Sequence, residues 1–167
     1  MQARMQLTAL AQVRTLESAV IWGRRPEAAA ALAREMSRAL GLPVTATADA
    51  KAAVRAADIV VTTTPATWPI LSADWLSPGQ HVTAMGSDQP HKAELDPACL
   101  SRADLYVADR VAQSRIQGRD PVEHRPGQLC GSDLPAPQEA AGLVEEVHEA
   151  ARRLAVAQVL PCQQPGL

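Results

Sequence analysis

The sequence has almost no aromatic residues. Phe, Tyr and Trp together make up 2% of its 167 residues, and Phe is absent. A chain of this length can still bury one domain-sized core. That core has to be built from Ala, Val, Leu and Ile rather than from packed rings.

Cysteine, net charge and long apolar runs are also scarce. The three cysteines, Cys99, Cys130 and Cys162, form no CxxC pair, which favours a reduced, cytoplasmic chain. The formal charge of −2 gives no overall attraction to nucleic acid or to an anionic membrane. No apolar run is long enough to span a membrane, and the first ten residues do not read as a signal peptide. We therefore expect neither nucleic acid nor membrane as a partner.

What the sequence does contain is a regular alternation of strand-like and helix-like segments. Pro26 suits a first helical position, Gly41 suits a helix end, and the run 58–63 is typical of a strand buried on both faces. Strands that alternate with helices indicate an α/β fold with a doubly wound parallel sheet. The predicted helices are 2–13, 26–40, 49–57 and 96–101, and the predicted strands are 18–22, 43–48, 58–63, 80–85 and 104–108.

Ligands of such folds bind at the carboxyl ends of the strands. This rule places three segments at one edge of the sheet: 23–25, 63–65 and 86–88. Within the last segment, Asp88 is a candidate general base, although on spacing alone a polar surface loop with an N-cap Asp is the better explanation. The histidines are too scattered to form a ligand set, so we predict no metal site.

The turn after the first predicted strand is basic. Arg24 and Arg25 follow Gly23, and no Asp or Glu lies between Trp22 and Pro26. In a dinucleotide fold an acidic residue here binds the ribose 2′-OH, whereas an arginine accommodates a 2′-phosphate. The turn therefore favours NADP(H), and the alternative is a solvated basic turn.

The glycine-rich loop that should cradle the cofactor pyrophosphate is missing from this sequence. The fingerprint needs a strand, G-x-G-x-x-G/A and a helix, but no glycine precedes Gly23. We expect an incomplete Rossmann-type domain over residues 1–118. The residues 119–138 read as a loop or disordered segment, and 139–167 read as a helix followed by a tail.

Several blocks resemble the ornithine cyclodeaminase and mu-crystallin family, in order and with matching spacing over 2–118. The later blocks look most like the cyclodeaminase branch of ectoine utilisation. The blocks are "MQARMQLTALAQVRTLESAVIWGRRPEAAAALA", "ADIVVTTTP", "ILSADWLSPGQHVTAMGSDQPHKAELDP" and "ADLYVADRVAQSRIQG".

The resemblance implies hydride transfer from the α-carbon of a small amino acid to NAD(P), giving an imine that is deaminated or cyclised. It gives Asp88 the role of activating the amine or water at the reacting carbon. It implies that the turn Trp22, Gly23, Arg24 and Arg25 faces the adenosine. It places Thr63, Thr64 and Pro65 beside the cofactor, and Met85, Gly86 and Ser87 near the nicotinamide.

The resemblance also implies what this sequence does not contain. Family members have a first Rossmann strand, and a preceding region with the cations that grip the substrate carboxylate and much of a homodimer interface. We expect the chain alone to be inactive, with a gap in the middle of its sheet and two unpaired strand edges. The alternative is a non-catalytic, mu-crystallin-like fragment that binds a nucleotide or another small ligand.

Overall fold

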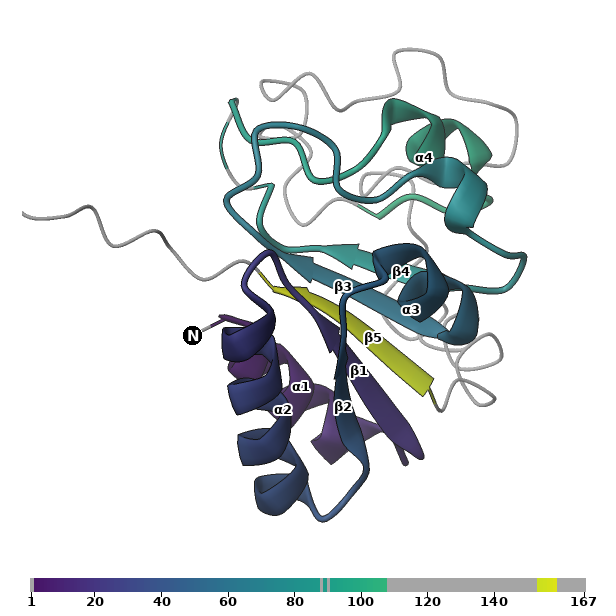
Figure 1. Cartoon of the computed structure of the whole chain (residues 1–167). Coiled ribbons are helices and arrows are strands. Elements are labelled where there is room, and N and C mark those ends of the chain that lie inside the picture. The colour runs from purple at the N-terminus through teal and green to yellow at the C-terminus, as the bar shows by residue number, and fades with distance from the viewer. Residues whose placement is uncertain (1, 88, 90, 108–152, 159–167) are drawn as a thin grey trace, which may run out of the picture.

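The computed structural model describes residues 2–87, 89, 91–107 and 153–158, which form a parallel sheet with helices on both faces (Figure 1). The α-helices are α1 (Gln2–Val13), α2 (Pro26–Leu40), α3 (Ala50–Ala56) and α4 (Pro97–Arg102), and a 3₁₀ turn, η1, spans Ala73–Trp75. The strands are β1 (Ser18–Trp22), β2 (Val44–Thr47), β3 (Ile59–Thr63), β4 (His81–Ala84) and β5 (Arg153–Gln158).

The order of the five strands in the sheet is β2-β1-β5-β3-β4, and every neighbouring pair is parallel. Dinucleotide-binding sheets have the order 3-2-1-4-5. The two orders agree if β5, the last described strand of the chain, stands in the place of the first strand. The α/β class with a doubly wound parallel sheet, predicted from the sequence, is confirmed.

The position of β5 corrects two expectations. Arg153–Gln158 was predicted to be helical but is a strand, and the expected gap between β1 and β3 is filled by it (Figure 1). Ala157 pairs with Trp22 on one side and with Thr62 on the other. The inner edges of β1 and β3 carry rows of N–H and C=O groups that need partners, and a strand between them satisfies both rows. Residues 139–152 and 159–167 lie outside the described part.

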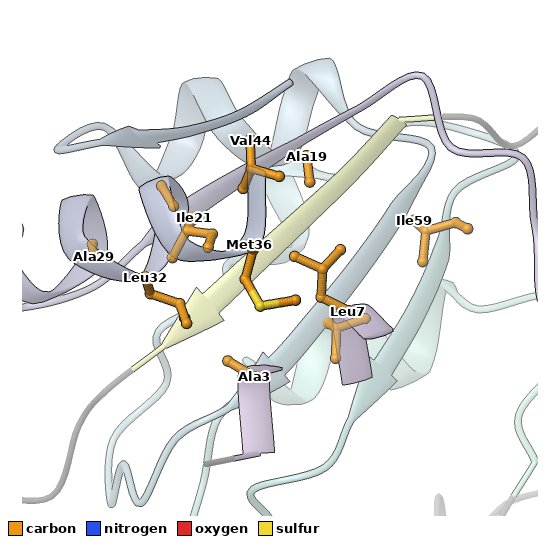
Figure 2. Packing of buried hydrophobic residues seen from close by; sticks show 11 residues of the cluster. Ala3, Leu7, Ala19, Ile21, Ala29, Leu32, Met36, Val44 and Ile59 are labelled. Atoms are coloured by element: carbon orange, nitrogen blue, oxygen red, sulfur yellow. The ribbon is translucent and has the colours of Figure 1, made fainter. Parts of the chain in front are cut away.

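Both faces of the sheet are covered, as β3 shows most directly. Ile59 and Val61 pack into an apolar cluster with α1 and α2, whereas Val60, on the opposite face, packs into a second cluster with α3 and the η1 region. In Figure 2, Leu7 of α1 and Met36 of α2 meet in the first of these layers. Because successive strand residues point to opposite faces, a strand that is buried along its whole length, as β3 is, requires this two-sided cover.

The helix ends follow the local sequence. Pro26 begins α2 and Gly41 ends it with φ of 67°, a left-handed conformation that glycine adopts without strain. The Asp49 carboxylate caps α3 by accepting a 2.9 Å hydrogen bond from the Ala52 amide.

Of the predicted strand 104–108, the described residues 104–107 form no strand, so that prediction is wrong there.

Candidate functional site: the carboxyl edge of the sheet

The three predicted segments follow β1, β3 and β4, whose carboxyl ends lie at one edge of the sheet. The segments after β3 and β4 are adjacent, because these two strands pair directly. The turn after β1 is separated from β3 by β5, which at about 4.8 Å per strand spacing puts the two strand ends about 10 Å apart. The predicted residues thus form two groups along the same edge.

The first group is the turn from β1 into α2. Trp22 is partly buried and Gly23 buried, whereas Arg24 and Arg25 are exposed. Within the described part of the chain, neither guanidinium has a side-chain hydrogen bond or ion pair. Arg25 directly precedes α2, whose N-terminal end carries a positive partial charge. The turn therefore presents two available cations and a helix N-terminus at the edge, which suits an anion.

The second group joins the ends of β3 and β4. Thr63, Thr64 and Ser87 are buried, whereas Pro65 and Met85 are exposed to solvent. The Met85 amide donates a 2.9 Å hydrogen bond to the Thr62 carbonyl, which extends the pairing of β3 and β4 to this point. The two strand ends therefore form one continuous surface.

Gly86 lies against β3 at very short range. A Cβ atom on Gly86 would stand 2.0 Å from the Thr64 carbonyl oxygen and 2.6 Å from the Oε1 atom of Glu94. No real Cβ atom approaches another atom so closely, so only glycine fits between these two groups. The backbone of the β4 loop is thus pressed onto the end of β3.

Glu94 is the residue of this edge that sequence reasoning missed. Its side chain is fully buried, and its carboxylate accepts hydrogen bonds from the Thr62 hydroxyl and from the amides of Thr64 and Gly86. In the sequence it looks like one more charge in a polar loop. The one available signal was Gly86, since a glycine at a strand end can mark a close approach of backbone to another group.

Asp88, the predicted catalytic residue, lies outside the described residues.

Among the described residues no group of His, Cys, Asp and Glu could hold a metal ion. None of the described helices is long and apolar enough to cross a membrane.

Burial, and then the Asp96 carboxylate, raises the pKa of the Cys99 thiol to about 11, so this thiol stays neutral and poorly nucleophilic.

Comparison with known proteins identifies the family of the chain. The sequence pattern of the ornithine cyclodeaminase/mu-crystallin family matches residues 1–149. The chain belongs to this family. The resemblance seen in the sequence blocks is therefore confirmed.

Two family members are similar in sequence. The chain is 53% identical over 117 residues to "Uncharacterized cyclodeaminase y4tK" of Sinorhizobium fredii, covering 70% of this chain and 35% of that protein. It is 37% identical over 108 residues to a Delta(1)-pyrroline-2-carboxylate reductase of Bacillus cereus, covering 65% of this chain and 33% of that protein. The chain thus spans about a third of the length of these curated relatives.

A solved structure has the same fold. The iminosuccinate reductase of Paracoccus denitrificans, in complex with NAD⁺, superposes with a TM-score of 0.67 at 25% sequence identity. The match covers 96% of this chain and 48% of that one. The Rossmann-type architecture of the described residues is therefore shared with a reductase whose structure contains NAD⁺.

Proposed function

We propose that this chain is the NADP(H)-binding part of a cyclodeaminase-like or imine-reducing protein that acts on a small amino acid. The observation that carries the proposal is the convergence of three strand ends at one edge of a 3-2-1-4-5 sheet. The named relatives, a cyclodeaminase and two reductases of imino acids, support the substrate class. The blocks that resemble the ectoine branch favour a role in ectoine breakdown.

The preference for the 2′-phosphorylated cofactor rests on the turn after β1. Arg24 and Arg25 are exposed and have no side-chain partner among the described residues, and no acid is present to bind a ribose 2′-OH. The ends of β3 and β4, with Thr63, Thr64 and Ser87, stand where the nicotinamide half would extend. In this arrangement the cofactor crosses the edge from β1 to β4.

The described residues fit the pyrophosphate of the cofactor less well than its adenosine and nicotinamide ends. The described residues around the end of β5 and the start of α1, Gln158 and Gln2, include no glycine turn that would let the backbone approach it. We therefore propose modest cofactor affinity and no turnover by the chain alone, with Asp88 as the acid–base group of the complete protein. The alternative is a non-catalytic, mu-crystallin-like fragment that binds a nucleotide or another small ligand, and the lack of a glycine turn among these described residues favours it.

The adenosine half of the site can be tested without the pyrophosphate. Binding of 2′,5′-ADP and of 5′-AMP is measured by calorimetry for the wild type and for Arg24→Ala. A charge-assisted contact is worth about 1.5–3 kcal/mol, so we expect Arg24→Ala to weaken 2′,5′-ADP by roughly tenfold or more and to leave 5′-AMP unchanged.

The matched control is Arg38→Ala, which removes the same charge from the exposed last turn of α2. It should change neither affinity. Equal affinities of the wild type for the two nucleotides, or equal losses in both variants, would contradict the 2′-phosphate assignment.

A further inference from the structure

We infer that Glu94 is a positioning residue: it holds the ends of β3 and β4 in the relative arrangement that receives the nicotinamide end of the cofactor. The inference rests on the proposed function and deepens it, because it assigns a role to a residue outside the three segments that are proposed to line the cofactor. The supporting observations are the burial of Glu94, the set of donors around its carboxylate and the fit at Gly86.

The carboxylate of Glu94 bridges two strand ends. Its Oε1 atom accepts from the Thr64 amide, and its Oε2 atom accepts from the Thr62 hydroxyl at 2.7 Å and the Gly86 amide at 2.8 Å. Thr62 and Thr64 belong to the end of β3, whereas Gly86 follows β4. One side chain therefore satisfies two backbone amides that lie beyond the regular strand pairing.

The main chain of Glu94 extends the same connection. Its carbonyl accepts hydrogen bonds of 2.8 and 3.0 Å from the amides of Ile70 and Leu71, and its amide donates to the Ser87 hydroxyl at 3.1 Å. The loop after β3 and the loop after β4 are thus both tied to one residue. These are the loops that carry Thr63–Pro65 and Met85–Ser87.

A carboxylate is required at this point because all three groups donate. A carboxylate has two acceptor oxygens, whereas a glutamine amide has one acceptor oxygen and an NH₂ group that only donates. Whichever way the side-chain amide of a Glu94→Gln variant turned, its NH₂ would face the Thr64 amide or the Gly86 amide. One buried N–H would lose its partner, and an unsatisfied buried donor is costly.

The variant Glu94→Gln separates a local positioning role from a general folding role. Its control is Glu35→Gln, since Glu35 also accepts two hydrogen bonds, from Arg4, but does so exposed on α2. Two quantities are measured for each variant: the hydrogen exchange of backbone amides and the affinity for NADPH. We expect Glu94→Gln to lose protection at Thr64 or Gly86 by at least tenfold, to keep protection in β1 and β2, and to raise the Kd for NADPH about tenfold.

Thr62→Val is the milder companion variant if Glu94→Gln does not fold. It removes the hydroxyl donor and leaves both amide bonds, so we expect faster exchange at Gly86 and a Kd for NADPH raised roughly threefold. Glu35→Gln should match the wild type in both measurements.

Three outcomes would overturn either the role of Glu94 or the proposed function. Unchanged protection at both Thr64 and Gly86 in folded Glu94→Gln overturns the inference. Lost protection with unchanged NADPH affinity also overturns it, because the ordering would then be irrelevant to the cofactor. A wild type that binds no NADPH overturns the proposed function instead, and the exchange data then still decide whether Glu94 orders the two strand ends.

Discussion

Gly86 and Glu94 determine how closely the loops after β3 and β4 approach each other. Both residues are needed for the same contact, since the space beside Gly86 is taken by the Thr64 backbone and the Glu94 carboxylate. The sequence indicated Gly86 through its place after a predicted strand and through the family resemblance, but it indicated no role for Glu94. The hydrogen bond between Thr64 and Glu94 joins residues 30 positions apart in the sequence. The local pattern of a polar loop does not indicate that its glutamate is buried.

Gly86→Ala should destabilise the protein because the new Cβ atom would clash with the Thr64 backbone and the Glu94 carboxylate. Backbone dihedral strain is not the cause. We expect a loss of about 3 kcal/mol in the free energy of unfolding, the upper range for overpacking, measured by urea denaturation. Gly79→Ala is the control: its φ is 80°, but a Cβ atom there meets nothing within 4 Å. The strain of a left-handed alanine costs only about 1–2 kcal/mol. A Gly86→Ala variant as stable as Gly79→Ala would refute the close approach.

Among the elements, β5 is the one that sequence patterns could not place. The segments of β1 to β4 and of α1 to α4 were all predicted as strand or helix, since their periodicity and end signals are local. Arg153–Gln158 contains Arg, Leu, Ala and Gln, which favour helices. Its strand conformation comes from pairing with β1 and β3, which are far away in sequence, and such pairing overrides intrinsic preference.

Val156→Pro should damage the sheet at its centre. Val156 stands in register between Ile21 and Val61, so a proline there removes an N–H from a strand with partners on both sides. We expect a loss of about 3 kcal/mol or more in the free energy of unfolding, measured by circular dichroism in urea. Ala50→Pro, at the first position of α3, where a proline is tolerated, serves as the control and should leave the unfolding curve nearly unchanged. Equal stability of the two variants would mean that β5 is not part of the sheet.

For the molecule as a whole, the strand order explains why the site lies where it does. With β5 in the central position, the sheet has the topology of a dinucleotide-binding domain, although its central strand comes late in the chain. The switch point of that topology lies at the end of β5, between the basic turn after β1 and the joined ends of β3 and β4. The sequence predicted that the three segments share one edge of the sheet, and the parallel strands confirm this, because it depends only on strand direction and not on which segment fills the centre.

Binding of NADP(H) at this edge of the sheet can be tested by mapping the NADPH contact on the folded chain. Backbone amide signals are followed by nuclear magnetic resonance as NADPH is added. We expect changes at Gly23–Arg25, Thr63–Pro65 and Met85–Ser87, with the far end of α2 around Arg38 unaffected. Changes concentrated elsewhere, or no changes at millimolar NADPH, would contradict binding at this edge.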